Sequence, residues 1–255
     1  MENKDIAERI IERLKMFNRK ERDHLIKNAL CDMPKNLQLS TWLREALFGD
    51  EAPGQPEHLF VGMDYHLNWL FAALATSEVE ELSKDCLFKN EWNVEAMPAE
   101  NDKNEFPIQN NQEDFDLLIA SWGPEISPRL RIFLIEAKLN SKWCSKQITS
   151  KKERLTLIRE HSKNRDLNLN FIDWHFVLTS LGENGPSKGG FSHENFLGDF
   201  EWLRDPEKRG IEEGCVLRHI QMPVYRPLFQ VKRLSDSDVG RTKWEVVLRS
   251  EGSKS

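Results

Sequence analysis

Residues 115–138, FDLLIASWGPEISPRLRIFLIEAK, decide the fold of this chain. Two apolar runs are separated by a turn-forming segment over Gly123–Pro128, and this pattern predicts a β-hairpin. The first strand carries Asp116 near its start, and the second ends with Glu136 and Lys138. Burying a charge in an apolar strand costs several kcal/mol unless the charge is paired or binds a metal. These three residues are therefore the first candidates for a functional site.

The predicted hairpin brings the three charged residues to one edge of a sheet. Residues two apart on a strand point to the same face, so Glu136 and Lys138 share a face. The start of one antiparallel strand lies beside the end of the next, which places Asp116 next to them. The second strand is apolar on both faces until its end, as central strands are, and open α/β sheets hold ligands at the carboxyl ends of their strands. The alternative is an ordinary solvent-facing salt bridge.

The rest of the chain predicts an α/β fold with a mixed central β-sheet flanked by helices. The strand before the polar 141–165 segment and the strand after it are expected to be parallel. A Pro- and Gly-rich segment at 49–58 predicts a boundary between a helical cap or interaction region, 1–55, and a main domain, 56–255. The other expected elements are short helices within 1–50, a long apolar helix at 63–82, a strand at 171–182, a helix at 192–204 and two C-terminal strands.

Composition limits the classes of function. The chain is 39% hydrophobic and carries a net charge of −6, so binding to nucleic acid would depend on a local basic patch. Its four cysteines are far apart with no CxxC pair, which argues against a zinc ribbon or a disulfide framework and fits a reducing cytoplasm. No apolar run approaches the length of a membrane span, so no membrane association is expected.

An Asp on one hairpin strand, Glu-x-Lys closing the next and a polar helix after it resemble the PD-(D/E)xK nuclease superfamily. The resemblance implies a restriction-endonuclease-like core with an N-terminal helical extension. It also implies that Asp116, Glu136 and the backbone carbonyl of Ala137 hold Mg²⁺, with Mn²⁺ able to substitute, while Lys138 positions the attacking water. Such a metal activates water and stabilises in-line displacement at phosphorus. The chain departs from the family pattern at Phe115, where the family often has proline.

Two further residues come from the same resemblance. Gln147 lies nine residues after Lys138, where branches of the family carry a glutamine that faces the metal; the alternative is a solvated helix residue. Asp64 is placed as an additional metal ligand on the first helix of the core, or as the N-cap of that helix. His66, two residues later, is expected to be structural or to contact substrate rather than to bind metal.

A basic segment follows the candidate site. Residues 138–165 contain nine Lys or Arg and only two acidic residues, directly after the carboxylates where a phosphate backbone would lie. The alternative is an ordinary solvated helix face. The residues expected to contact nucleic acid are Lys142, Lys146, Lys151, Lys152 and Arg154.

These patterns predict a Mg²⁺-dependent nuclease that acts on DNA more readily than on RNA, within a restriction, defence or repair system. The alternative is a nuclease-fold protein that binds nucleic acid or a partner protein without cleaving. The N-terminal helices are the expected surface for a homodimer or a partner subunit.

Overall fold

A computed structural model of the chain describes twelve parts of the sequence. They are residues 3–30, 38–48, 56–82, 108, 113–123, 129–138, 150–151, 153–158, 171–181, 215–223, 229–233 and 244–248.

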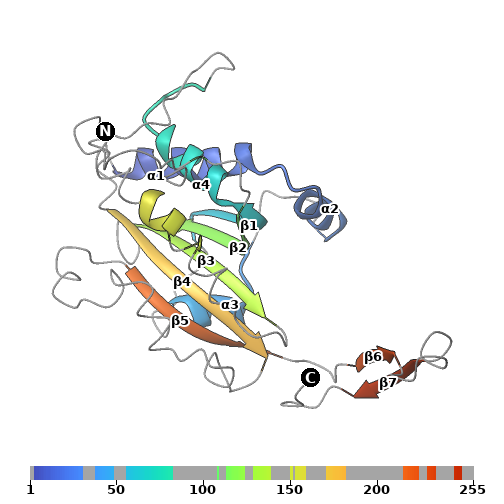
Figure 1. Ribbon diagram of the computed structural model, residues 1–255. Helices are drawn as coiled ribbons and strands as arrows, with labels where there is room; N and C mark the ends of the chain where they lie inside the picture. The colour runs from blue at the N-terminus through green and yellow to red at the C-terminus, as the bar shows by residue number, and fades with distance from the viewer. Residues whose placement is uncertain are drawn as a thin grey trace, which may run out of the picture.

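The centre of the molecule is a five-stranded mixed sheet in the order β1-β2-β3-β4-β5 (Figure 1). β1 and β2 pair antiparallel, as do β2 and β3, whereas β3, β4 and β5 run parallel. The predicted hairpin, the central position of its second strand and the parallel pairing after it are therefore confirmed. The strands are β1 His58–His66, β2 Asp114–Trp122, β3 Leu130–Lys138, β4 Ile172–Leu181 and β5 Cys215–Met222.

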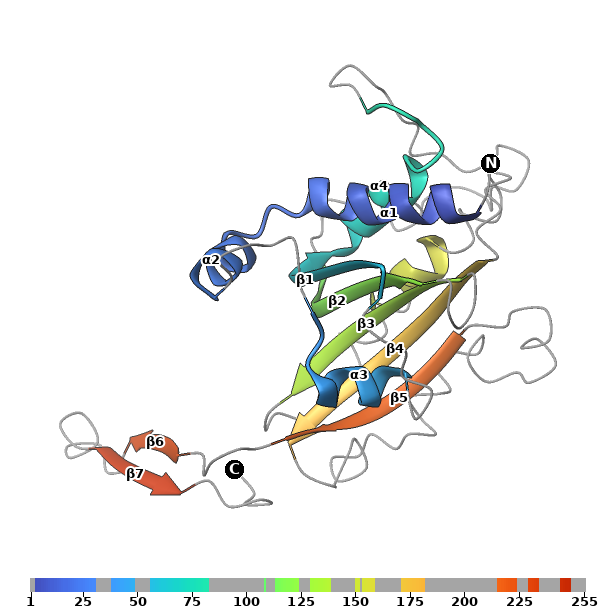
Figure 2. The same ribbon diagram turned by 180° about the vertical axis from the view of Figure 1, so that it is seen from behind.

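Helices cover both faces of the sheet. α1 (Asn3–Phe17) and α4 (Leu67–Ala75) lie on one face, together with helical residues 150–151 and 153–158, here called the crossover helix. α3 (Thr41–Phe48) lies on the opposite face, behind the sheet in Figure 1 and in front of it in Figure 2. The fold is thus α/β, with a mixed sheet between helices.

Each face of the sheet has its own apolar core. The first core is formed by one apolar face of α1, one apolar face of α4 and alternate residues of the strands. A helix repeats its buried face every three to four residues, and a strand repeats its face every two. Its fully buried members include Ile10, Leu14, Leu70, Leu74 and Leu118. The second core lies under α3 and includes Leu47, Ile119, Phe133 and Val177. Residues before the predicted boundary at 55 therefore share both cores with residues after it.

The helix predicted at 63–82 is wrong at its start. β1 occupies residues up to His66, and α4 begins at Leu67 and ends at Ala75. His66 is the N-cap, with extended backbone angles of φ −70° and ψ 138°. Asp64 is accordingly a strand residue, so neither its placement on a helix nor the N-cap alternative holds.

The C-terminal part differs from the prediction in one strand. β5 was not expected from the sequence, whereas the two terminal strands are confirmed as an antiparallel pair, β6 (Phe229–Arg233) and β7 (Trp244–Leu248). This pair forms a separate two-stranded sheet, away from the five-stranded sheet in Figures 1 and 2. The helix predicted at 192–204 lies outside the described residues. Within the described part of the chain, no helix has the length and apolarity required to cross a membrane.

Candidate active site

The Asp116 carboxylate lies at the end of β3. Regular pairing of β2 with β3 extends to Leu117 opposite Ile135, one position short of Asp116 and Glu136. Beyond that point the Asp116 side chain replaces the backbone pairing, because its Oδ2 accepts a hydrogen bond from the backbone N–H of Ala137 at 2.6 Å. This contact fixes the Asp116 carboxylate beside the residue that follows Glu136, as the predicted hairpin requires.

Glu136 is buried and ion-paired. Its Oε2 accepts a short hydrogen bond from the ammonium group of Lys151, on the crossover helix. The two side chains are 2% and 4% exposed, so the ion pair is shielded from solvent. The same ammonium group lies over the ring of Phe115, 4.9 Å from its centroid. A lysine this deeply buried requires such partners, since the desolvation of a lone ammonium ion costs several kcal/mol.

Two contacts beside Lys151 hold the crossover helix against the sheet and α4. The Ser150 hydroxyl donates to Glu113 Oε1, and the Arg154 guanidinium donates to Asn68 Oδ1. Burial lowers the pKa of Arg154, while the nearby carboxylate of Glu113 acts in the opposite direction. The crossover helix therefore presents Lys151 to Glu136 from a fixed position.

Asp64 lies opposite Asp116 on the neighbouring strand, because Met63 pairs with Leu117 and Tyr65 with Phe115. Asp64 has a φ of 46°, in the left-handed region that costs an ordinary L-residue about 1–2 kcal/mol. Its Oδ2 lies 3.6 Å from Arg22 Nη1, and the Arg22 side chain is 81% exposed, so this ion pair contributes little.

The alternation of faces reverses at this pair of aspartates. On β2, Leu117 packs in the second core, yet Phe115, two residues earlier, packs in the first core. On β1, Val61 packs against the second core and Tyr65 is buried in the first. Residues two apart on a regular strand share a face, so both strands change phase between these positions. We call the position of Asp64 and Asp116 the aspartate rung.

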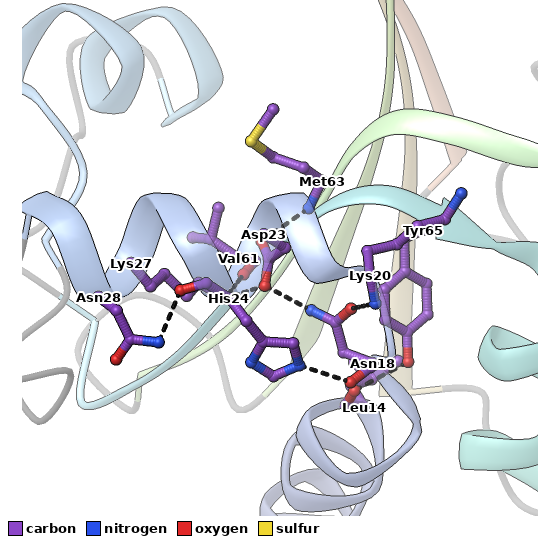
Figure 3. A network of polar contacts seen from close by, with 10 residues as sticks. All are labelled: Leu14, Asn18, Lys20, Asp23, His24, Lys27, Asn28, Val61, Met63 and Tyr65. Atoms are coloured by element: carbon purple, nitrogen blue, oxygen red, sulfur yellow. Dashed lines mark hydrogen bonds and ion pairs between the residues drawn. The ribbon is translucent and has the colours of Figure 1, made fainter.

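Side chains of α2 (Glu21–Leu30) hold β1 just before the aspartate rung (Figure 3). Asp23 is 2% exposed; its Oδ1 accepts from the Met63 backbone N–H, and its Oδ2 accepts from Lys27 and Asn18. The Lys27 ammonium group also donates to the carbonyl of Val61 at 2.5 Å. The carboxylate and the ammonium group thus satisfy backbone groups on the outer edge of β1.

His66 follows the aspartate rung and is 8% exposed. Its ring meets Trp69 edge-on at 4.2 Å between centroids. Burial lowers the pKa of His66, the charge of Lys20 adds to this shift, and the carboxylates of Asp114 and Asp64 oppose it. The His66 ring is thus packed against Trp69 at the start of α4, and its expected role, structural or in contact with substrate, stays a prediction.

The donor chemistry at Asp116 and Glu136 suits Mg²⁺. Both supply carboxylate oxygens, and Mg²⁺ commonly takes one or two carboxylates with waters and substrate phosphates as its other ligands. The bound ammonium group of Lys151 is a stand-in cation, which indicates that the surroundings of Glu136 accept positive charge. No group of three or more His, Cys, Asp or Glu in the described residues is arranged to hold a metal, so Asp64 is not gathered into a three-carboxylate cluster.

The remaining predicted residues divide into two groups. Lys151 and Arg154, expected on a basic surface, are each 3% exposed and belong to the interior beside Glu136. The expectation that they contact nucleic acid is corrected, because both side chains are buried and Lys151 shares the buried stripe of the crossover helix with Leu155 and Ile158. The backbone of Lys138 ends β3, but its side chain lies outside the described part. Also outside it are Gln147, Lys142, Lys146 and Lys152.

Sequence reasoning missed the partnership of Lys151 with Glu136. The signal was the spacing 151, 155 and 158, which puts a lysine on the apolar stripe of a helix that must pack on the sheet. It also missed Glu113, which directly precedes β2 and binds Ser150. No comparable signal marks Glu113, since it ends a long acidic, polar stretch.

Comparison of the chain with protein-family models, with curated proteins and with solved structures finds no match. The functional argument therefore depends on the residues of this chain and their geometry.

Proposed function

We propose that this protein is a metal-dependent nuclease that hydrolyses phosphodiester bonds, with DNA as its substrate. The observation that carries the proposal is the Asp116 carboxylate bound to the backbone N–H of Ala137, the residue that follows the buried Glu136 on β3. Two acidic side chains fixed at the carboxyl end of a central strand are costly to maintain unless they have a ligand or a counter-ion.

In this proposal Asp116 and Glu136 hold Mg²⁺, with the carbonyl of Ala137 as a further ligand. The bound metal would activate water and offset negative charge on the phosphate. The chain's own residues do the positioning: the backbone of Ala137 orients Asp116, and Lys151 holds the Glu136 carboxylate before a metal binds. Lys138, at the end of the same strand, is assigned to the attacking water, and Gln147 to the metal side of the site.

Contact with the nucleic acid is assigned to three lysines of the basic segment 138–165, Lys142, Lys146 and Lys152. They follow the candidate site in the sequence and form part of a local basic excess in an acidic chain. Lys151 and Arg154 are buried, so we assign them to the organisation of the site instead.

One observation favours a second candidate, a protein of similar architecture that binds nucleic acid without cleaving it. Glu136 already has a buried counter-ion in Lys151, so its carboxylate is neutralised without a metal. A binding protein would need no further cation at this position. The two candidates differ in whether metal binding at Glu136 leads to hydrolysis.

The deciding experiment incubates the purified chain with single-stranded, double-stranded and branched DNA and RNA, in Mg²⁺ or Mn²⁺. We expect metal-dependent cleavage of DNA, lowered by about 10²-fold or more in Glu136→Gln, as when a group that stabilises the transition state is removed. The matched control is Glu153→Gln, an exposed position on the crossover helix, which should cleave like the wild type.

Thermal unfolding of both variants separates loss of chemistry from loss of fold. Cleavage that persists at wild-type rate in a folded Glu136→Gln protein would refute the site. Binding of DNA and of Mn²⁺ with no cleavage of any substrate would favour the second candidate.

A further inference from the structure

We propose that Lys151 is an exchangeable counter-cation of Glu136. Its ammonium group neutralises the buried carboxylate while no metal is bound, and it leaves the carboxylate oxygen when a divalent cation binds there. This inference rests on the proposed function, because it requires Glu136 to be a metal ligand.

The burial of both partners is the first argument. The Lys151 and Glu136 side chains are 4% and 2% exposed, and lysine and glutamate are almost never this deeply buried unless paired. Removing one charge of a buried pair leaves the other uncompensated, which is strongly unfavourable. A cation that binds Glu136 can replace Lys151 only because it restores the positive charge beside the carboxylate.

The geometry of the two partners is the second argument. Glu136 lies on a central strand paired on both sides, whereas Lys151 reaches it by a flexible four-carbon side chain. The backbone of the crossover helix is held next to Lys151 by the Ser150–Glu113 hydrogen bond. Exchange at Glu136 therefore requires a rotamer change of one lysine and no movement of a helix or strand.

Phe115 provides the third argument, because it offers the displaced ammonium group a second partner. The Lys151 Nζ lies 4.9 Å from the centroid of the Phe115 ring, within the range of a cation–π interaction. Phe115 immediately precedes Asp116, so an ammonium group held over this ring stays at the candidate site. Its released charge would add to the attraction of the site for a phosphate group.

The test measures Mn²⁺ affinity by calorimetry on the metal-stripped full chain. Two like charges about 4 Å apart repel each other more strongly in a buried site than in water, so Lys151→Met should bind Mn²⁺ roughly tenfold more tightly than the wild type. Lys151→Arg, which keeps the charge, should bind like the wild type. The matched control is Lys15→Met, which removes the charge of an exposed pair with Glu12 on α1 and should leave the affinity unchanged.

Equal or weaker Mn²⁺ binding by Lys151→Met would overturn the counter-cation role and leave the proposed nuclease intact. No Mn²⁺ binding by the wild type would overturn both the inference and the metal-dependent mechanism. These two failures are distinguishable without any measurement of activity.

Lys151→Met leaves Glu136 as an unpaired buried charge, a change large enough to unfold the variant. In that case acetylation of the wild-type chain, mapped by mass spectrometry with and without Mn²⁺, decides the question. Lys151 should be protected without metal and several-fold more reactive with it, as expected when an ion pair opens. A reactivity that Mn²⁺ leaves unchanged would overturn the proposal.

Discussion

At the scale of single residues, Gly62 shows how tightly β1 is packed before the aspartate rung. A Cβ atom at this position would lie 2.7 Å from Phe60 Cζ and 2.9 Å from Tyr65 Cδ2. Both rings are buried and meet edge-on, with centroids 5.3 Å apart. Neither ring can move without disturbing the first core, so the glycine is required by space.

Gly62→Ala should lower the free energy of unfolding by about 1–3 kcal/mol, the usual cost of overpacking a core. Urea unfolding followed by circular dichroism measures this change. The matched control is Gly123→Ala, where the nearest atoms to the added Cβ lie at 3.9 Å and 4.0 Å and no strain is expected. Equal stability of the two variants would show that the rings over Gly62 repack freely.

Residue-scale prediction from the sequence succeeded for groups whose chemistry conflicts with their surroundings. Asp116 was predicted to lie near Glu136 because the start of one antiparallel strand lies beside the end of the next, and the Asp116–Ala137 hydrogen bond agrees with that neighbourhood. Lys151 was misplaced on the surface because a charge within a basic run looks solvated. Only the packing of the crossover helix on the sheet reveals that it is buried.

At the scale of elements, α2 closes the free edge of the sheet. β1 is an edge strand, and edge strands expose backbone groups that can pair with another chain. Asp23 accepts from the N–H of Met63, and Lys27 donates to the carbonyl of Val61. Two side chains of α2, four residues apart, therefore satisfy backbone groups of β1 that a sixth strand would otherwise pair with.

Asp23→Ala should destabilise the protein by about 2–3 kcal/mol, because it removes several hydrogen bonds to one buried carboxylate. It should also speed hydrogen exchange at the Met63 amide, which NMR can follow directly. Glu21→Ala is the control, since this exposed acid in the first turn of α2 should cost about 0.3–1 kcal/mol. Unchanged protection of Met63 in Asp23→Ala would mean that this amide has another partner.

Element-scale prediction was best where strands are buried on both faces. β2, β3 and β4 were predicted from continuous apolar runs, and their pairing followed from a turn and a crossover. Residues 63–66 at the end of β1 were taken as the start of a helix because they lead directly into the apolar residues of α4, and the N-cap His66 makes no side-chain capping bond. Arg218 and His219 interrupt the apolar residues of β5, so the sequence pattern did not indicate a strand there.

At the scale of the whole molecule, α1 completes the fold. Ile10, Ile11 and Leu14 are at most 1% exposed, and the backbone carbonyl of Leu14 accepts from the Tyr65 hydroxyl at 2.9 Å. The sequence predicted a helical cap or interaction region before a boundary at 55, because Pro and Gly cluster at 49–58. What the sequence could not show is that the apolar face of this region lies on the sheet.

A fragment of residues 56–255 should therefore fail to unfold cooperatively, since it exposes the first core where α1 packs. A fragment of residues 1–223, which lacks the β6–β7 pair, should keep a cooperative transition because that pair forms a sheet of its own. Chemical unfolding monitored by near-UV circular dichroism compares them. A cooperative transition in the 56–255 fragment would show that the sheet is stable without α1.

The aspartate rung has a consequence for how β1 finds its partner. A one-residue slip would carry every core side chain of β1 to the wrong face, and the cost of this grows with the length of the strand. The phase change at Asp64 and Asp116 adds a second condition for correct pairing, because these two irregular positions must lie opposite each other for the hydrogen bonding between β1 and β2 to continue. The aspartate rung therefore favours a single alignment of β1 with β2 during folding, the alignment that places Asp64 opposite Asp116.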